Sequence, residues 1–482
     1  MLRKFLNIVL DATASIPMQA ECAIYTSPFT RKETSQFAWL SSQAPCFPVR
    51  AENITILTEP QQFYDTLIEK CRGAKERVTL SSLYVGTGQL EQNLVQALMD
   101  NDNFQNGTAK INILLDYTRG SRYKNNSRVI LKPLLQRNDQ NCHISLYHTP
   151  ILRGLKKKWV PDRWNELFGL QHMKLYIFDD TLLISGANLS NDYFTNRQDR
   201  YYMIKDRDLT DFYNGLVRQV QRFSLYLDKE DEVHIRRSWS QLPYQGNLND
   251  FVVNAGNLVE SYITQCINEQ NICKREGYDT WVFPLVQMGQ LGINQDACVT
   301  KRLLAEAPSG ASLCIATGYF NLTWDYMDTL VTKCFANCKL LMAHPNANGF
   351  QGASFPAGGI PDAYSLIAQR FKNMFEGSGQ SERFSMQEYF REGWTYHGKG
   401  LWYYAPEQDL PNLTLIGSPN FGERSVRRDL ETQLAIVTEN GGLRQKMDEE
   451  CKQLYKLGLP ANVDRVIPKW VYPMVYFFRG FF

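Results

Sequence analysis

The sequence predicts an α/β protein made of two similar α/β/α halves, which pack about a pseudo-twofold axis around one shared active site. Three observations predict this fold. A His-x-Lys step occurs twice in the chain. A β-rich run, a glycine, an amphipathic helical pattern and a second strand precede each step, as in a βαβ unit with a right-handed crossover. An asparagine and, eleven residues later, an acid follow each step. The matched segments are 78–98, 110–117, 171–180 and 182–199 in the first half, and 311–330, 338–345, 396–404 and 413–431 in the second.

This repeat divides the chain into five parts. Turn residues in "SWSQLPYQGNLND" place the boundary between the halves near residues 235–280. The segment 346–385, rich in Gly, Ser and Pro, is expected to form a long loop over the second half. The expected parts are an N-terminal arm (1–50), a first half (51–235), a linker (236–280), a second half (281–460) and an aromatic C-terminal tail (461–482).

The composition is that of a globular protein without a dominant charge. The 482 residues suffice for two domains, and a hydrophobic content of 44% supports a large core. The net charge of +2 gives no global field typical of a nucleic-acid binder, so we expect no nucleic-acid partner. The eleven cysteines contain no C-x-x-C pair, and Cys334 with Cys338 lacks the second pair of a zinc site. We therefore expect reduced, mostly buried thiols and no metal site.

The two ends of the chain each leave two interpretations open. No run approaches the ~18 apolar residues of a spanning helix. The N-terminal "MLRKFLNIVLDATASIPMQ" places Arg3 and Lys4 on an apolar stretch, which fits a mitochondrial presequence, whereas Asp11 and Glu21 fit a disordered arm. The C-terminal "VIPKWVYPMVYFFRGFF" combines aromatic residues with cations, which fits a membrane interface or a tail that docks on the core.

The repeated His-x-Lys step predicts phosphoryl-transfer chemistry. Side chains at i and i+2 of a strand point to the same face, so His172 and Lys174 project together. The same holds for His397 and Lys399. Two lysines suit the oxygens of one phosphodiester, while one neutral histidine attacks phosphorus and the other protonates the leaving oxygen. This is a ping-pong reaction through a phosphohistidine, and it requires no metal or other cofactor.

Several residues near the two steps acquire supporting roles. Asparagine and serine side chains can donate hydrogen bonds to phosphate oxygens, and an acid can hold the Nδ1–H of a histidine and fix its tautomer. The expected phosphate donors are Asn188, Ser418 and Asn420, and the expected histidine partners are Asp199 and Glu431. Asp179 completes the first catalytic motif, and we expect it to brace the loop after the strand without touching substrate.

These motifs resemble the phospholipase D superfamily, whose signature is H-x-K-x4-D followed by G-S-x-N. Over about residues 52–455 the chain is similar to the eukaryotic phosphatidylglycerophosphate synthases. The resemblance implies transfer of a phosphatidyl group from CDP-diacylglycerol to glycerol 3-phosphate, with release of CMP, in mitochondria and toward cardiolipin. It rests on "LYVGTGQLEQ", "ILLDYTRGSR", "GLQHMKLYIFDD", "SGANLSNDYFTNRQDRY", "TGYFNLT", "GWTYHGKGLW" and "LTLIGSPNFGERSVRRDLE".

The resemblance also implies roles for the two histidines, with His172 as nucleophile and His397 as acid and then base. The chain departs from the superfamily pattern at two places. Tyr404 stands where the second motif has Asp, followed by the extra residues "APEQDLP", and a tyrosine there could brace through its hydroxyl. Ser185-Gly186-Ala187 stands where the first half would have Gly-Ser-x.

Two further segments point to anionic ligands. The basic runs at 118–128 and 153–163 suit anionic substrates or lipid head groups, or else form a solvated basic face. The resemblance implies a nucleotide contact in "SSLYVGTG", although no Gly-Lys-Ser/Thr makes it a P-loop, and a strand end with a glycine turn is the other interpretation. Its residues are Ser81, Ser82, Leu83, Tyr84, Val85, Gly86, Thr87 and Gly88. The sequence gives no support for an effect of ATP or of a divalent cation.

The expected function is that of a phosphatidyltransferase whose partners are CDP-diacylglycerol, glycerol 3-phosphate and a membrane surface. The resemblance places it in mitochondria, peripherally on the inner membrane. Two alternatives share the motifs. A phospholipase D-type hydrolase of lipid or nucleic acid would use water in the second step, and a non-catalytic lipid-binding protein would keep a relic of the site.

Overall fold

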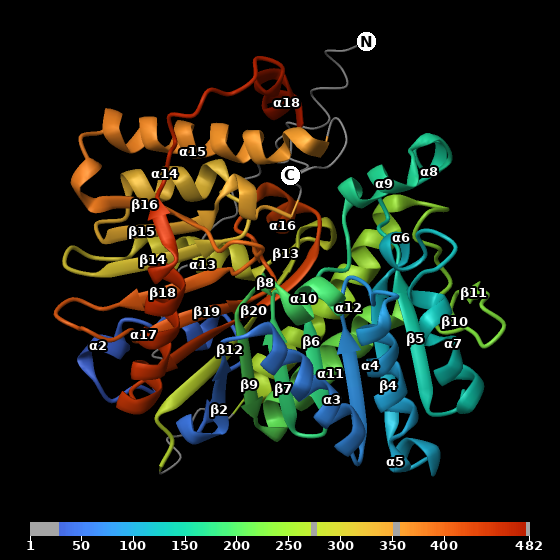
Figure 1. Ribbon diagram of the computed structural model, residues 1–482. Coiled ribbons are helices and arrows are strands. Elements are labelled where there is room, and N and C mark those ends of the chain that lie inside the picture. The colour runs from blue at the N-terminus through green and yellow to red at the C-terminus, as the bar shows by residue number, and fades with distance from the viewer. Residues whose placement is uncertain (1–27, 271–276, 350–356, 479–482) are drawn as a thin grey trace.

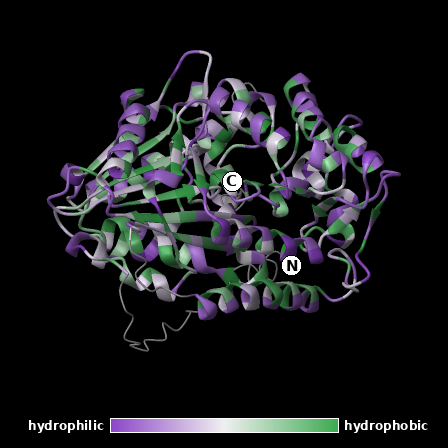
Figure 2. Cartoon of the chain, turned by 90° about the horizontal axis from the view of Figure 1, so that it is seen from below, coloured by the Kyte–Doolittle hydropathy of each residue, from purple (hydrophilic) through white to green (hydrophobic). Residues whose placement is uncertain are grey.

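The computed structural model describes residues 28–270, 277–349 and 357–478. It confirms the α/β prediction, because each half contributes one large mixed sheet with helices on its faces (Figure 1). The strands are largely hydrophobic, while the surrounding helices carry hydrophilic residues toward the outside (Figure 2).

The first-half sheet is built around parallel strands. Its strands are β2 (Ile54–Leu57), β3 (Arg77–Ser81), β4 (Lys110–Asp116), β5 (Cys142–Tyr147), β6 (Leu175–Phe178), β7 (Thr181–Ser185), β9 (Tyr201–Lys205), β10 (Leu225–Leu227) and β11 (Val233–His234). They lie in the order β11-β10-β5-β4-β3-β6-β7-β9-β2, in which β3, β4 and β5 are parallel. Its helices are α3 (Pro60–Gly73), α4 (Gln89–Met99), α5 (Asp102–Gln105), α6 (Tyr117–Gly120), α7 (Ser127–Arg137), α8 (Gly154–Trp159), α9 (Asp162–Asn165), α10 (Asn191–Thr195) and α11 (Arg207–Arg222).

The second-half sheet repeats this plan. Its strands are β1 (Phe47–Val49), β12 (Thr280–Met288), β13 (Ile293–Asn294), β14 (Ser312–Thr317), β15 (Asn337–Ala343), β16 (Phe384–Tyr389), β18 (Gly400–Tyr404), β19 (Leu413–Gly417), β20 (Leu430–Thr438) and β21 (Gly458–Pro460). They lie in the order β1-β12-β20-β19-β18-β14-β15-β16-β21, with β13 beside β12. Its helices are α13 (Gln295–Ala305), α14 (Trp324–Thr332), α15 (Ile360–Gly377), α16 (Glu423–Arg427), α17 (Gly441–Lys456) and α18 (Val471–Phe478).

Eight strands of each sheet match when the second order is read in reverse: β10-β5-β4-β3-β6-β7-β9-β2 corresponds to β21-β16-β15-β14-β18-β19-β20-β12. This match confirms the prediction of two similar halves. Parallel strands β14, β15 and β16 correspond to β3, β4 and β5, and the antiparallel β18 corresponds to β6. Each His-x-Lys step therefore lies immediately before corresponding strands, β6 in the first half and β18 in the second. Short 3-10 helices complete the fold: η1 (Ala38–Ser42), η2 (Ala51–Asn53), η3 (Glu166–Phe168), η4 (Gly289–Leu291), η5 (Pro345–Ala347), η6 (Ala357–Gly359) and η7 (Ser381–Arg383).

The halves share a continuous hydrophobic core. One buried cluster joins Leu175 and Tyr202 of the first sheet to Ile416 and Leu434 of the second. Burial of this apolar surface is a large favourable term in folding, so the two halves stabilise each other. Strands β7 and β19, which occupy matching positions in the two sheets, contact each other across this interface.

A buried arginine fastens the first half to the second. Nε and NH2 of Arg200 donate to the carboxylate of Glu450 on α17, at 2.7 and 2.9 Å. NH1 donates to the carbonyl of Leu415 at 2.7 Å, and the guanidinium lies 3.8 Å from the ring centroid of Trp402. These contacts satisfy the charge of an arginine whose side chain is fully buried.

The stretch between the halves is mostly helical. Helix α12 (Leu248–Glu269) packs on α11 and contributes Phe251, Val259 and Ile263 to the shared core. The chain therefore passes from one half to the other along a packed helix, and residues 271–276 lie outside the described part.

Residues 28–49 belong structurally to the second half. Strand β1 pairs with β12 at the edge of the second sheet, and Phe29 and Phe37 join its core. Glu439 accepts hydrogen bonds from the backbone of Thr30 and Arg31 at 2.8 and 2.9 Å. The segment predicted to be a presequence or a disordered arm lies largely in residues 1–27, outside the described part.

One sequence prediction is wrong, because the segment 346–385 is not a long loop. Helix α15 occupies its middle. Pro361 stands in the first turn, where the missing N–H costs nothing, and so starts the helix instead of breaking it. Phe371 and Phe375, one turn apart, are buried and give the helix an apolar face.

The C-terminal tail docks on the second half through one side and exposes aromatic residues on the other. Helix α18 packs against α15, with Val471 and Val475 fully buried. Trp470, Tyr472 and Tyr476 are exposed, and residues 479–482 lie outside the described part. Among the described helices, none is both long and apolar enough to cross a membrane.

Candidate active site

Backbone hydrogen bonds join the active-site segments of the two halves. The amide of His172 donates to the carbonyl of Leu430 at 2.9 Å, and the amide of His397 donates to the carbonyl of Gln198 at 2.8 Å. The hydrogen bond from His397 continues a small parallel sheet, which pairs β8 (Arg197–Gln198) with β17 (Thr395–Tyr396). Each histidine is thus held by the residue that immediately precedes the acid of the other half.

The acids consequently serve the histidine of the opposite half. Nδ1 of His172 lies 2.9 Å from Oε1 of Glu431, and Nδ1 of His397 lies 2.7 Å from Oδ2 of Asp199. Both acids and both histidines are buried. A carboxylate that accepts the Nδ1–H leaves the lone pair on Nε2, so each ring is oriented with Nε2 available for chemistry. This geometry supports the histidine-partner roles expected from the sequence.

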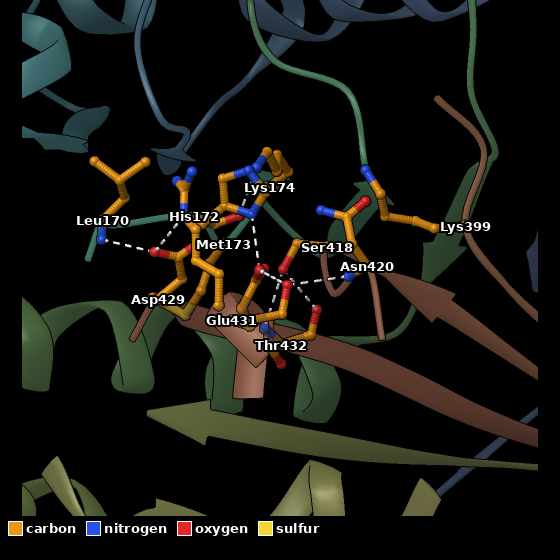
Figure 3. Close-up of polar contacts among 12 residues, drawn as sticks. Leu170, His172, Met173, Lys174, Lys399, Ser418, Asn420, Asp429, Glu431 and Thr432 are labelled. Carbon is orange, nitrogen blue, oxygen red and sulfur yellow. Dashed lines mark hydrogen bonds and ion pairs between the residues drawn. The ribbon is translucent and has the colours of Figure 1, made fainter. Parts of the chain in front are cut away.

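Two buried lysines accompany the histidines. Nζ of Lys174 donates to the carbonyl of His172 at 2.8 Å. Nζ of Lys399 lies 3.0 Å from Nδ1 and 3.2 Å from Nε2 of His397. Figure 3 shows Ser418, Asn420 and Glu431 between Lys399 on one side and His172 on the other, so residues of both halves form one site.

Gly186 explains one departure from the superfamily pattern. A Cβ at this position would lie 2.8 Å from both carboxylate oxygens of Asp199 and 3.0 Å from Nζ of Lys399. Those distances are shorter than a carbon atom tolerates next to buried, bonded groups. The first half therefore carries a glycine where the second half carries Ser418.

The electrostatics of the site are set by burial. Burial, with a smaller effect of Lys174, holds the pKa of His172 well below its usual range, and burial with Lys399 does the same for His397. Both histidines are therefore neutral near pH 7. Burial also lowers the pKa of Lys174 well below its usual range and that of Lys399 to about 8. An anionic phosphodiester would favour the charged form of both lysines.

This shift predicts a specific pH dependence. Lys399 of the free enzyme is protonated below about pH 8 and loses its charge as the pH rises through that value. We expect kcat/KM for a phosphodiester donor to fall above about pH 8, because this parameter reports the free enzyme. We expect kcat to fall only at higher pH, because the bound anion raises the pKa of Lys399. Steady-state rates from pH 6 to 10 test this, and a kcat/KM that stays level up to pH 10 would contradict it.

The expected phosphate donors lie within the site. Oδ1 of Asn188 and Oδ1 of Asn420 are buried without a hydrogen-bond partner among the described residues. Oγ of Ser418 is 3.2 Å from both the backbone oxygen and the nitrogen of Thr432. The side-chain oxygens of both asparagines thus accept no hydrogen bond from the described residues, whereas the hydroxyl of Ser418 is hydrogen-bonded to the backbone of Thr432. Their role toward phosphate remains a prediction.

The two turn-bracing residues behave differently. The carboxylate of Asp179 accepts hydrogen bonds from three successive backbone amides, those of Lys75, Glu76 and Arg77, at 2.9, 2.7 and 3.1 Å. This supports the bracing role, and it places Asp179 at the end of β6 away from His172. Tyr404 donates instead to Asp448 of α17 at 3.1 Å, so the second half holds its turn by a different contact.

The stretch 81–88 is largely used by the fold itself. Ser81 and Ser82 are fully buried, and Nε2 of Gln171 donates to Oγ of Ser81 at 3.0 Å. Val85 forms an isolated bridge with Leu189, and Gly88 precedes helix α4 as its N-cap. These contacts support the strand-end interpretation, and the nucleotide contact stays a prediction.

Sequence reasoning missed residues that line the histidines. Tyr193 and Arg197 stand between Asn188 and Asp199 in the repeat, and the hydroxyl of Tyr193 lies 3.3 Å from Nε2 of His397. Only their position within a matched segment could have signalled them.

A second missed pair lies beside the other histidine. Ligand-type atoms of His172, Asp429 and Glu431 lie within 4.8 Å of one another, an arrangement that could hold a cation. The carboxylates are already engaged, since Asp429 lies 2.9 Å from Nε of Arg424 and Glu431 accepts from Ser425 at 2.9 Å. Arg424 therefore supplies the positive charge at this place.

The fold and the paired His-x-Lys steps define a member of the phospholipase D superfamily. The solved phosphatidylserine synthase of Haemophilus influenzae has this fold, with a TM-score of 0.67 and 22% identity over 93% of this chain and 97% of that one. The chain is 43% identical to the mitochondrial CDP-diacylglycerol–glycerol-3-phosphate 3-phosphatidyltransferase of Gallus gallus, over 87% of this chain and 81% of the relative. It is 42% identical to the enzyme of the same name from Homo sapiens, over 93% and 86%. No family model matches. The chain belongs to the family of CDP-diacylglycerol–glycerol-3-phosphate 3-phosphatidyltransferases.

Proposed function

We propose that this enzyme transfers the phosphatidyl group of CDP-diacylglycerol to glycerol 3-phosphate, which yields phosphatidylglycerol phosphate and CMP. The observation that carries the proposal is the crossed pairing of two neutral histidines with the acid of the opposite half, in a chain of this family. Such a pair supplies a nucleophile and a general acid–base for one phosphorus atom.

The first half-reaction forms a covalent intermediate. Binding of the anionic donor favours uptake of a proton at Nε2 of His397. Nε2 of His172 then attacks the phosphorus that carries the diacylglycerol, the bond from this phosphorus to the CMP oxygen breaks, and Nε2 of His397 gives this proton to the leaving oxygen. Glu431 holds His172 through Nδ1 and stabilises the positive charge that the ring acquires. Lys174 and Lys399 neutralise the equatorial oxygens.

The second half-reaction reverses these roles. The free primary hydroxyl of glycerol 3-phosphate attacks the phosphorus, its proton passes to Nε2 of His397, and the bond from phosphorus to His172 breaks. Asp199 stabilises the protonated ring of His397. The proposal assigns charge neutralisation to the two lysines and routes no step through a metal or another cofactor.

Purified protein tests this function with CDP-diacylglycerol in vesicles and labelled glycerol 3-phosphate, with the lipid product identified by mass. The expected product is phosphatidylglycerol phosphate, and CMP release should depend on the acceptor. Release of CMP at the same rate without glycerol 3-phosphate would indicate hydrolysis instead, and no release at all would indicate a binding protein.

We also propose that the enzyme works peripherally on a membrane, since its donor is a lipid. Helix α8 exposes Leu155 and Trp159 on either side of Lys156, Lys157 and Lys158. Helix α18 exposes aromatic residues on the same upper side of the molecule in Figure 1. Exposed aromatics beside lysines suit the interface of an anionic bilayer. The name of the relatives supports a mitochondrial location, and we place the enzyme on the inner membrane.

Replacing Lys156, Lys157 and Lys158 by alanine is expected to weaken binding to anionic vesicles. At about 1 kcal/mol for each lysine near an anionic surface, the loss is on the order of a hundredfold. Vesicle sedimentation with and without anionic lipid measures it. The matched control replaces Lys70 and Arg72 of the last turn of α3 and the nearby Lys75 by alanine, and should bind like the unchanged protein, since helix α3 lies at the lower side of Figure 1. Equal loss in both variants would contradict an oriented membrane face.

A further inference from the structure

An arginine that no motif singled out stands one aromatic ring away from His397. The guanidinium of Arg197 lies 4.7 Å from the ring centroid of Tyr193, and the hydroxyl of Tyr193 lies 3.3 Å from Nε2 of His397. Nε of Arg197 donates to Oγ1 of Thr395 at 2.9 Å, so β17 holds the side chain in place. In the proposed reaction His397 transfers protons through Nε2. Arg197 therefore lies near the reacting end of the His397 ring.

The order of the reaction decides what enters on this side. In an in-line displacement the nucleophile and the leaving group lie on opposite sides of the phosphorus. If His172 attacks, the leaving CMP and then the acceptor hydroxyl occupy the side of His397, which exchanges a proton with each. The phosphate of the acceptor stands at the other end of its glycerol chain, a span comparable to a tyrosine ring.

We infer that Arg197 binds the phosphate monoester of the acceptor and thereby selects glycerol 3-phosphate over acceptors that lack this group. A planar guanidinium donates two parallel hydrogen bonds to phosphate oxygens, which suits a dianion better than a neutral alcohol. Water and glycerol make no such contact. The residue therefore acts in binding and specificity, and His397 keeps the proton transfer.

The ion-pair partner of Arg197 lies at the surface and leaves room for such a phosphate to compete with it. NH2 lies 3.3 Å from the carboxylate of Asp192, whose side chain is 58% exposed, whereas that of Arg197 is 15% exposed, so Asp192 can turn into solvent while the guanidinium stays in place. Arg424, the other arginine near the histidines, is committed to Asp429 at 2.9 Å, and Asp429 is only 3% exposed. Arg424 also lies beside His172, on the side of the nucleophile. The structure thus favours Arg197 for the acceptor.

This inference rests on the proposed transferase activity, and its test separates the two. The variant Arg197→Gln removes the charge and keeps the polarity of the side chain. We expect kcat/KM for glycerol 3-phosphate to fall about 10- to 100-fold, mainly through KM, as for loss of a charge-assisted hydrogen bond. In mixtures with excess glycerol, the ratio of phosphatidylglycerol phosphate to phosphatidylglycerol should fall by a similar factor. Arg197→Lys should recover part of the loss.

The matched control is Arg391→Gln. Arg391 also lies over an aromatic ring, that of Trp394 at 3.5 Å, and pairs with Glu59, but none of its described contacts involves either histidine. It should leave both measurements unchanged. An unchanged KM for glycerol 3-phosphate in Arg197→Gln, or a larger increase in Arg424→Gln, would overturn the inference. If the unchanged protein forms no phosphatidylglycerol phosphate at all, the proposed function itself is wrong.

Discussion

Replacing His172 by asparagine is expected to abolish the covalent phosphatidyl–enzyme and to lower turnover by about four to six orders of magnitude, as when an activated nucleophile is lost. Asparagine preserves much of the size of the side chain. The backbone hydrogen bond from residue 172 to Leu430 remains, so the contact between the two halves at this place should survive. What disappears is the Nε2 lone pair that Glu431 orients from the other half.

Rapid mixing with CDP-diacylglycerol labelled in its diacylglycerol part, followed by acid-free denaturation, measures the intermediate. The matched variant is His397→Asn, which keeps the nucleophile and loses the proton-transfer group. Because CMP is a good leaving group, this variant should still acquire label but pass it on slowly to glycerol 3-phosphate. Label retained by His172→Asn and lost by His397→Asn would reverse the two roles, and would also move the acceptor to the side of Arg424.

Replacing Arg200 by methionine is expected to destabilise the protein by about 3–5 kcal/mol, because it leaves the buried carboxylate of Glu450 without its charge partner. The variant also loses the hydrogen bond to Leu415 and the stacking on Trp402. The midpoint and slope of denaturant unfolding measure the loss. Since Arg200 directly follows Asp199, catalysis should decline with the interface.

Two comparisons make this result specific. The double variant Arg200→Met with Glu450→Gln should recover part of the stability, since no unpaired charge stays buried. Arg207→Met removes an exposed arginine that pairs with three carboxylates, those of Glu76, Asp180 and Asp211. The loss of stability in Arg207→Met should be much smaller than in Arg200→Met. Equal losses for Arg200→Met and Arg207→Met would show that the interface does not depend on the buried pair.

The duplicated fold could be predicted because it depends on local patterns. Strand, glycine and helix signals repeat at matched spacing, and i, i+2 alternation places each lysine beside its histidine. The wrong prediction of a loop at 346–385 came from the same kind of local evidence. Pro361 and the glycines near it were interpreted as loop residues, but they would indicate a loop only inside a helix, where they interrupt it. At the first turn of a helix a proline has the opposite meaning.

The pairing of acids with histidines could not be predicted in the same way. Spacing along the chain shows that Asp199 and Glu431 belong near the site, but it does not show which ring each one contacts. Which acid contacts which ring depends on the backbone hydrogen bonds that join short segments of the two halves. The roles of Arg197 and Arg200 were hidden for a related reason, since Thr395 holds the first and Glu450 the second, and both partners lie far away in the sequence.

The crossed contacts have a consequence for the origin of the molecule. Neither His172 nor His397 is oriented by an acid of its own half, because Glu431 holds the first and Asp199 the second. An ancestor of half this length would have been competent only as a symmetric pair of identical chains, each completing the other. Joined in one chain, the two copies no longer need to be identical. The first half now has aspartate with a neighbouring glycine and the second has glutamate with a neighbouring serine, so the surroundings of the two histidines differ.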